Sequence, residues 1–306
     1  MLLALLCASA VSANELRLAR TLSGGDIQYT VRKGDSLAAM GSRFGVEPSV
    51  LARANGLETG ERLEPGSSLR VDNRHVVPDQ LEDGIVVDMP QRMVFFVADG
   101  VLAAAYPAAL GQASWRTPEG DFTVVEKTVN PIWTVPVSIQ RDMARQGKAV
   151  LTRVLAGPRN PLGKRWIGLS LGGIGIHGTT KPLSVYHFRS HGCIRLNADD
   201  VAALFLMVEP GTPGTIIDAP VLLAQLDDGR IFVEANPDIS GLAPDSLHDL
   251  HTLADSSDIG NLIDWQRVKD ALERKDGLAR EVTAREAPAG SDSMREASLN
   301  TALVRP

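Results

Sequence analysis

The sequence predicts a mostly-β protein with a small helical module before the main sheet and a polar extension after it. Short apolar segments between residues 84 and 219 are separated by glycine and proline turns, as in a β-sandwich or barrel. Residues 28–71 combine strand and helix patterns, and the residues after 281 show no apolar periodicity. These observations predict a β-sandwich domain with one or two helices, a preceding βααβ module and a partly disordered C-terminal tail.

Composition places the chain among ordinary globular proteins and excludes several other classes. Hydrophobic residues make up 44% and charged residues 22% of the 306 positions, which is enough apolar side chain to fill a core. The net charge is −6 and aromatic residues are 5%, so no basic field or stacking surface for nucleic acid is expected. No apolar run approaches the ~18–20 residues that cross a bilayer, so the mature chain is predicted to lack a transmembrane segment.

The chain begins with a short apolar run, Met1–Ala8, followed by small residues that end in Val11–Ala13. Small residues at the first and third positions before a cut suit a signal peptidase, so residues 1–13 are predicted to be a signal peptide. A buried N-terminal helix is the alternative. The cut removes Cys7 and leaves Cys193 as the only cysteine of an exported protein. Such a thiol cannot form an internal disulfide, so it is either incidental or reactive.

Residues 28–71 carry the local signals of a strand–helix–helix–strand module. A short alternating strand precedes Gly34, which turns the chain, and Ser36 is a suitable helix N-cap. Apolar residues then recur at helical spacing up to Gly45, which is expected to end the first helix. A second helix is expected from Pro48, and the last strand is expected at Leu69, Arg70 and Val71.

This module resembles the LysM domain over its whole length. The opening pattern of that family is matched by YTVRKGDSLAAMGSRFGV at 29–46, and the later part by LARANGL at 51–57 and LEPGSSLRV at 63–71. LysM domains bind glycans built on N-acetylglucosamine, so the resemblance implies a peptidoglycan-binding domain over residues 28–71. A module used only as a spacer is the alternative, because fold alone does not determine function.

A polar stretch at 72–83 is predicted to be a linker, and the β-rich domain is expected over residues 84–219. Its expected strands are Ile85–Asp88, Met93–Val97, Leu102–Tyr106, Phe122–Val125, Ile174–His177 and Gly214–Ile217. One helix is expected after Asn197, which is interpreted as an N-cap with Asp200 in the manner of a capping box.

Residues 220–306 form the C-terminal extension. Less regular structure is expected after Ala235, apart from one amphipathic helix at Ile259–Leu272. Residues 281–306 mix Ala, Ser, Glu, Arg and Pro without an apolar period, so they are predicted to be largely disordered.

The residues that can carry chemistry lie in two segments, GIHGT at 175–179 and SHGCIRLN at 190–197. A free thiol has a pKa of about 8.5, so a nucleophilic cysteine needs an imidazole that takes its proton. Gly192 leaves room for substrate beside Cys193 and lets backbone N–H groups face a developing oxyanion. Arg195 is suited to binding a carboxylate. Together these residues predict an acyl-transfer site.

Two histidines are candidates for the base, and spacing alone leaves both open. His191 lies two residues before Cys193 and can share its side of an extended chain, whereas His177 ends a predicted strand that faces a loop. A zinc site built from His187, His191 and Cys193 is a further alternative, although no second cysteine or carboxylate lies at ligand spacing. For Arg195, the alternative to binding a carboxylate of the substrate is a surface ion pair within the protein.

The same segments closely resemble the catalytic domain of L,D-transpeptidases, the YkuD-type enzymes of peptidoglycan cross-linking. The family motif places a histidine before a Ser/Thr-His-Gly-Cys segment, and here His177 precedes SHGCIR. The resemblance extends to TPEGDFTVVEKTVNPIWTVP at 117–136 and GPRNPLGKRWIGL at 157–169, which look like the periplasmic, ErfK-like branch that carries a LysM module. It covers residues 84–219.

The resemblance implies a role for each matching residue. Cys193 corresponds to the nucleophile and His177 to the general base, while His191 helps to shape the site. The Gly178 carbonyl would orient the base, and the Gly192 N–H would bind the oxyanion. Contacts with substrate would come from Ser190, Arg195 and Trp133. Trp133 and Trp166 are candidates either for the donor groove or for the core.

The resemblance also implies the reaction. Cys193 would attack the third residue of a peptidoglycan tetrapeptide stem, release D-Ala and form a thioester. A diaminopimelate side-chain amine would then give a 3–3 cross-link, a lysine of an outer-membrane lipoprotein would give an attached protein, and water would give L,D-carboxypeptidase trimming. No cofactor or metal is implied, and the expected location is the periplasm. A non-catalytic LysM-type peptidoglycan-binding protein is the alternative.

Overall fold

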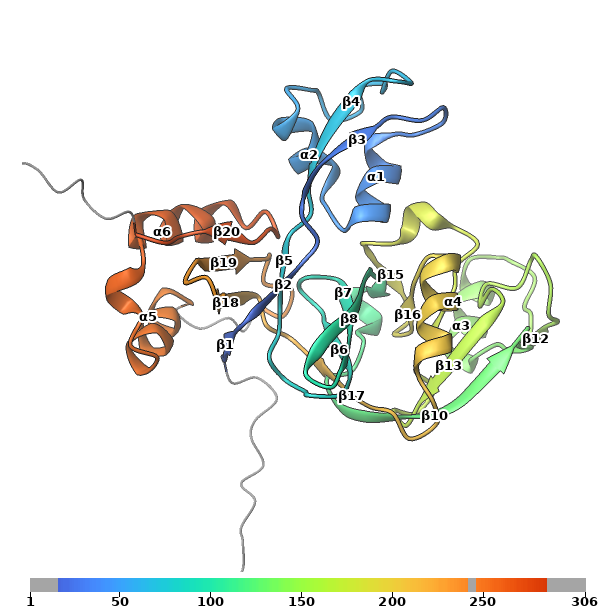
Figure 1. The fold of residues 1–306 in the computed structure, drawn as a ribbon. Coiled ribbons are helices and arrows are strands. Elements are labelled where there is room, and N and C mark those ends of the chain that lie inside the picture. Colours follow the sequence, from blue (N-terminus) through green and yellow to red (C-terminus); the bar gives the residue numbers. More distant parts are fainter. Residues whose placement is uncertain (1–15, 242–245, 285–306) are drawn as a thin grey trace, which may run out of the picture.

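The computed structural model describes residues 16–241 and 246–284 (Figure 1). The predicted signal peptide lies outside the described residues, and so does the part of the predicted disordered tail that follows residue 284. None of the helices in these two ranges is both long and apolar enough to cross a membrane.

The N-terminal module has the predicted βααβ order. Strand β3 (Asp26–Thr30) pairs antiparallel with β4 (Ser68–Asp72), and helices α1 (Leu37–Phe44) and α2 (Pro48–Ala54) lie between them in the chain. The Ser36 hydroxyl accepts a hydrogen bond from the Ala39 N–H and so caps α1. Gly45 ends α1 in the left-handed region, with φ at 70°. Apolar residues of both helices and both strands form a small core, to which Leu278 of the C-terminal unit also contributes.

The β-rich domain is built on one curled sheet of eight strands in the order β16-β14-β13-β10-β17-β6-β7-β8. The strands are β6 (Gly84–Asp88), β7 (Met93–Ala98), β8 (Val101–Pro107), β10 (Gly120–Val129), β13 (Arg165–Leu169), β14 (Gly175–His177), β16 (Ile194–Arg195) and β17 (Pro213–Ile217).

Strand β10 folds this sheet around its core. Its first half pairs with β17 and its second half with β13, with a register shift between Val124 and Glu126. Apolar residues of both halves therefore face one core, which helix α4 (Ala198–Met207) covers through Val201 and Leu204. The predicted helix is confirmed, but the capping box is wrong. The Asn197 side chain donates to Asp200 and to the Ser42 carbonyl, so it leaves the first turn of α4 without a side-chain cap.

Several short elements surround the sheet. They are β9 (Leu110–Gly111), η1 (Ala113–Trp115), β11 (Trp133–Thr134), α3 (Val137–Arg145), β12 (Arg153–Val154), η2 (Pro182–Ser184) and β15 (Phe188–Ser190). Strand β9 pairs with β15, and β11 pairs with β12. The segment from β11 to β12, which includes α3, forms a flap beside the sheet.

The C-terminal extension, which was expected to lose regular structure after Ala235, instead forms a third folded unit. Strands β18 (Val221–Gln225), β19 (Ile231–Ala235) and β20 (Arg280–Glu281) form a sheet with β1 (Leu18–Ala19) from the other end of the chain. The predicted helix at Ile259–Leu272 is replaced by η3 (Gly260–Leu262) and α6 (Trp265–Arg274), because the Asp264 carboxylate caps α6. Helix α5 (Ser246–Ser256) packs beside them, and His251 stacks on Trp265.

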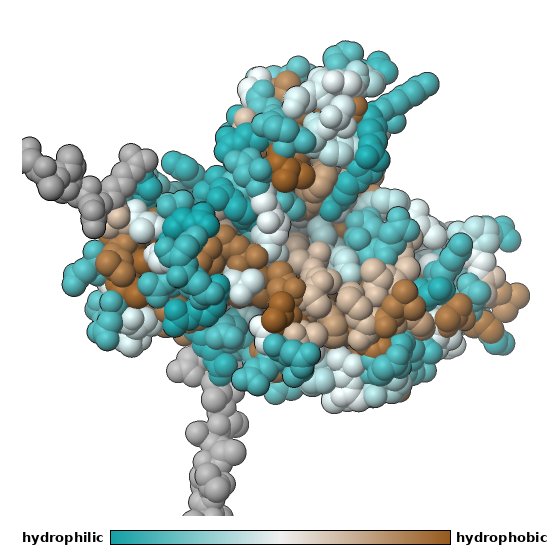
Figure 2. Space-filling model, in the orientation of Figure 1, coloured by the Kyte–Doolittle hydropathy of each residue, from teal (hydrophilic) through white to brown (hydrophobic). Residues whose placement is uncertain are grey.

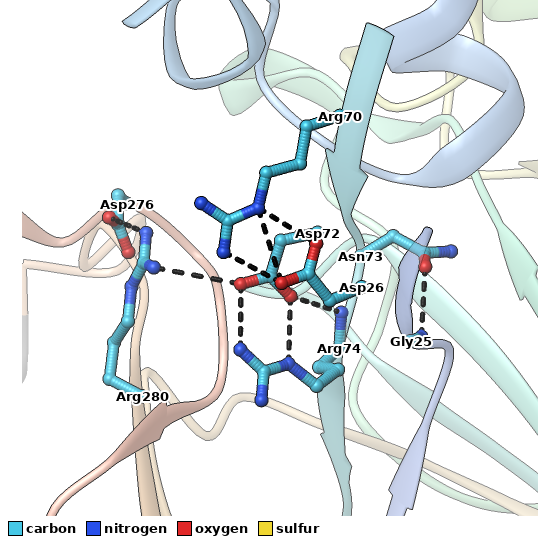
Figure 3. A network of polar contacts seen from close by, with 8 residues as sticks. All are labelled: Gly25, Asp26, Arg70, Asp72, Asn73, Arg74, Asp276 and Arg280. Carbon is cyan, nitrogen blue, oxygen red and sulfur yellow. Dashed lines mark hydrogen bonds and ion pairs between the residues drawn. The ribbon is translucent and has the colours of Figure 1, made fainter. Parts of the chain in front are cut away.

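The predicted linker is partly structured and joins the units. Its strand β5 (His75–Val77) pairs with β2 (Thr21–Ser23). Figure 3 shows the polar contacts around its start, where Asp72 binds Arg74 through both carboxylate oxygens. Arg280 of β20 reaches the same carboxylate at 3.7 Å, which links the C-terminal unit to the N-terminal module.

A buried polar network joins all three units. Glu234 of β19 is fully buried, and its carboxylate accepts hydrogen bonds from the His75 ring at 3.0 Å, the Val76 N–H at 2.7 Å and the Gln91 side chain at 2.8 Å. The other ring nitrogen of His75 lies 2.9 Å from the Gly45 carbonyl oxygen. The N-terminal module, β5, the turn before β7 and the C-terminal unit therefore share one set of buried contacts.

Glu234→Ala should destabilise the protein strongly, because it leaves the buried His75 and Gln91 donors without their acceptor. We expect a loss of about 3–5 kcal/mol in the free energy of unfolding, measured by urea denaturation. Asp228→Ala is the matched control, since its pair with Arg230 lies about half exposed and should be worth less than about 1 kcal/mol. Equal losses in the two variants would contradict the importance of this junction.

The N-terminal module also contacts the segment that leads to Cys193. The Ser42 hydroxyl of α1 donates to the Val185 carbonyl at 3.2 Å. Arg92 pairs with Glu47, and its guanidinium lies 4.0 Å from the centre of the Tyr186 ring. Through these contacts the module rests on residues 185–186, a few positions before the turn that carries the thiol.

Candidate active site

A cavity of about 720 Å³ lies between the face of strands β10, β13, β14 and β16 and the flap. Among the predicted site residues, its lining includes Trp133, His177, His191, Cys193 and Arg195. The structure thus brings together side chains that lie up to 62 positions apart in the sequence. Exposed apolar residues gather on and beside the flap, and Figure 2 shows hydrophobic surface at the β12 end of the molecule. These residues are Val129, Ile132, Val137, Val150, Leu151 and Leu155.

Strand register sets which side chains enter the cavity. Strands β14 and β16 are parallel, with Ile176 opposite Ile194 and His177 opposite Arg195. The two isoleucines are fully buried in the core. Because side chains alternate along a strand, His177 and Arg195 point to the other face, and Cys193, two residues before Arg195, lies on their side. Both candidate groups for proton transfer therefore face one cavity.

His177 is held in one orientation and one tautomer by its own strand end. Its Nδ1 lies 2.6 Å from the Gly178 carbonyl oxygen, so Nδ1 carries the proton and Nε2 keeps its lone pair. The side chain is nearly buried, and the Trp166 ring stacks on it with 5.9 Å between the ring centres. Burial lowers the pKa of His177 to about 4, so the ring is neutral near pH 7.

Cys193 lies in the short connection between β15 and β16. Its Sγ is 3.7 Å from the Gly173 carbonyl oxygen, which accepts a weak S–H hydrogen bond. Burial raises the pKa of the Cys193 thiol, although the Gly175 backbone and the charge of Arg195 act in the opposite direction. Near pH 7 the thiol and the imidazole are therefore both neutral, and a preformed thiolate–imidazolium pair is not favoured.

The turn before Cys193 is held by Ser190 and Thr117. The Ser190 hydroxyl accepts a hydrogen bond from the Gly192 N–H at 3.1 Å and donates one to the Cys193 carbonyl. The Thr117 hydroxyl donates to the Gly192 carbonyl at 2.9 Å. Gly192 has φ at 104°, a conformation that favours glycine.

These contacts differ from two expectations. Ser190 is fully buried beneath the turn and does not line the cavity, so its hydroxyl holds the turn instead of contacting substrate. The Gly192 N–H, expected to face an oxyanion, donates to Ser190. Thr117 was missed, since the sequence alone does not show that it lies under a turn 75 positions away.

His191 connects the turn to the flap. Its Nε2 lies 3.1 Å from the Asp142 carboxylate of α3, and its ring lies 5.4 Å from the Trp115 ring. Hydrogen bonds from His191 and Arg145 lower the pKa of Asp142. Asp142 was not among the predicted residues because α3 itself was not predicted.

Arg195 and Trp133 line the cavity as expected. Burial lowers the pKa of Arg195, which nevertheless remains a strong base. Over residues 16–241 and 246–284, no carboxylate pairs with its guanidinium, which is therefore available to an anionic group. In the same residues, no three or more His, Cys, Asp or Glu side chains gather so that they could hold a metal ion.

The family comparisons agree with the two domains. The model of the L,D-transpeptidase catalytic domain YkuD matches residues 82–216, and the LysM domain model matches residues 29–72. Among curated proteins, the chain is 30% identical to the probable L,D-transpeptidase ErfK/SrfK of Salmonella typhimurium, over 81% of this chain and 82% of that protein.

Two further relatives come from Escherichia coli. The chain is 31% identical to its probable L,D-transpeptidase ErfK/SrfK, over 72% of this chain and 73% of that protein. It is 32% identical to the probable L,D-transpeptidase YcfS, over 68% of this chain and 66% of that protein. Among solved structures, an L,D-transpeptidase from Mycobacterium smegmatis matches 67% of this chain and 95% of its own length, at 18% identity and a TM-score of 0.37.

The mostly-β fold with an N-terminal βααβ module, the two family models and the relatives that align over most of this chain agree with one another. The chain belongs to the L,D-transpeptidase family of enzymes and combines a YkuD catalytic domain with a LysM domain.

Proposed function

We propose that the protein transfers an acyl group from a peptidoglycan tetrapeptide stem through a thioester on Cys193. The observation that carries this proposal is the shared face of His177 and Cys193, with the imidazole tautomer fixed by the Gly178 carbonyl. A neutral imidazole that presents Nε2 can take the thiol proton when sulfur attacks a carbonyl carbon.

In the first half-reaction, the Cys193 sulfur bonds to the carbonyl carbon of the third stem residue as its proton passes to His177 Nε2. The tetrahedral intermediate then breaks its bond to the D-Ala nitrogen. His177 returns the proton to that nitrogen, so D-Ala leaves as a neutral amine and a thioester remains. Because the thiol is neutral at rest, its proton leaves as the sulfur attacks the carbonyl carbon.

In the second half-reaction, an amine attacks the thioester and His177 accepts its proton. The carbon–sulfur bond breaks, an amide forms, and the proton returns to the Cys193 sulfur. Arg195, whose guanidinium lines the cavity, would bind a carboxylate of the donor stem. Water in place of the amine gives L,D-carboxypeptidase trimming by the same route.

The acceptor and the location belong to the same proposal. A LysM domain that rests against the catalytic domain supports peptidoglycan as the substrate and the periplasm as the site of action. The amine would come from the diaminopimelate of a second stem, giving a 3–3 cross-link, or from a lysine of an outer-membrane lipoprotein.

Mass spectrometry of muropeptides from sacculi incubated with the enzyme tests the acceptor. We expect dimers joined 3–3, and peptide adducts as well when a lipoprotein with a terminal lysine is added. Tripeptides without any dimer would assign carboxypeptidase trimming instead. Unaltered sacculi, together with binding of the protein to them, would favour a non-catalytic peptidoglycan-binding protein and contradict the proposal.

A further inference from the structure

A row of aligned residues crosses the cavity floor from Glu126 to Cys193. Glu126 of β10 pairs with Gly168 of β13, and Gly168 pairs with Gly175 of β14. Ile176 pairs with Ile194 in parallel strands. The preceding residues, Gly175 and Cys193, are therefore placed side by side. Two glycines thus separate a carboxylate at one end of the row from the thiol at the other.

The Trp166 indole fills the space that these glycines leave. A Cβ atom on Gly175 would lie 2.4 Å from Cη2 of the indole, and one on Gly168 would lie 3.1 Å from its Nε1. The indole Nε1 donates to Glu126 Oε1 at 2.6 Å, while the ring stacks on His177. The indole therefore forms an apolar floor that runs from the Glu126 carboxylate toward the reacting groups.

The cavity has charges of opposite sign on different strands. Among the described residues that line it, Glu126 is the only carboxylate and Arg195 the only guanidinium. The neighbouring Lys127 points to the opposite side of the sheet, where it pairs with Glu209 at 2.8 Å. Trp166 occupies one oxygen of the Glu126 carboxylate through a single hydrogen bond, so the group retains capacity to accept others.

We propose that Glu126 recognises an ammonium group on the side chain of the donor residue whose carbonyl Cys193 attacks. Three strand spacings of about 4.8 Å place the two ends of the row about 14 Å apart at their Cα atoms. The side chains of Glu126 and Cys193 shorten that gap, and a donor side chain with a methylene stem can lie on the indole between them. Diaminopimelate fits this description, because it carries an ammonium several bonds beyond its reacting carbonyl.

This inference rests on the proposed function and names a specificity-determining residue for it. Arg195 would bind a carboxylate and Glu126 the ammonium, so a zwitterionic side chain would match both groups. A donor that ends in a neutral group would leave the Glu126 carboxylate without its partner. The predicted preference is therefore for a free amine over a blocked one.

The test compares two tetrapeptide donors, one with diaminopimelate as third residue and one with its side-chain amine acetylated. For the wild type, kcat/KM should favour the free amine by about 2- to 5-fold, the range expected for an ion pair with an exposed carboxylate such as Glu126. In Glu126→Gln, which keeps an oxygen acceptor for the indole N–H, that ratio should fall to about 1. The change should appear mainly in KM, because the ammonium is bound equally before and during reaction.

Glu209→Gln is the matched control, since it removes a carboxylate from the opposite side of the sheet and should keep the wild-type ratio. An unchanged ratio in Glu126→Gln would overturn the role of Glu126, and so would equal losses on both donors, which would indicate an effect through Trp166 and His177. Failure of the proposed function gives a different result, in which the wild type neither releases D-Ala from either donor nor gains the mass of a carbapenem.

Discussion

Cys193→Ala should lower the release of D-Ala from tetrapeptide stems by at least about 1000-fold, because Cys193 is the only thiol among the described residues that line the cavity. The neighbouring Ser190 hydroxyl lies beneath the turn, where it is hydrogen-bonded to the Cys193 carbonyl and the Gly192 N–H, so it does not replace the thiol. Chromatographic measurement of D-Ala from purified stems gives the rate directly.

Binding to insoluble peptidoglycan provides the control for this variant. The LysM domain has its own core, so Cys193→Ala should sediment with sacculi as the wild type does. A variant that releases D-Ala at the wild-type rate would refute the assignment of the nucleophile. Loss of both binding and release would indicate a folding defect, which Cys193→Ser then tests with a side chain of nearly the same size.

His177→Gln should lower kcat/KM by about 100- to 10,000-fold, since glutamine cannot accept the thiol proton. The same role predicts the acid limb of the pH profile. Burial lowers the pKa of His177 to about 4, so the ring stays neutral and able to accept a proton from pH 5 to 7. Activity should therefore be lost as pH falls through about 4. Initial rates of D-Ala release between pH 3.5 and 8 measure this limb.

The same pKa has a consequence for stability that must be separated from catalysis. The folded-state pKa of His177 lies below its unfolded value of 6.5, so the folded state binds fewer protons and loses stability as pH falls from about 6.5 toward 4. A shift of this size corresponds to roughly 3 kcal/mol at its full extent. Enzyme held at pH 4 and returned to pH 7 should regain its rate if the limb reflects protonation alone. An acid limb near pH 6.5 would contradict a buried, neutral His177.

Local signals were sufficient to predict the N-terminal module and the chemistry-bearing segments. Ser36 and Gly45 bound the first helix through contacts within a few residues, so the sequence predicts both ends of that helix. The SHGCIR segment and His177 were predicted to cooperate, and strand pairing between β14 and β16 brings them to one face. The mostly-β domain followed from its short strands and turns, although the β10 bend that curls the sheet depends on tertiary pairing.

Several of the missed features depend on contacts between distant parts of the chain. Helix α3 has nine residues and none of them is buried, so it contributes to no core that would distinguish it from a surface loop. The C-terminal sheet is completed by β1, which pairs Leu18 with Leu223. No local pattern signals a partner so far away. The same holds for the hydrogen bonds that Thr117 and Asp142 make to the Cys193 turn.

The most direct test of the account is the mass of the enzyme during turnover. Wild-type protein mixed with tetrapeptide stems and quenched in acid should carry the mass of the stem minus D-Ala, and peptide mapping should place it on Cys193. His177→Gln should show the adduct far more slowly, and Cys193→Ala should not show it. Release of D-Ala while the peptide that contains Cys193 stays unmodified throughout turnover would contradict acyl transfer through this thiol.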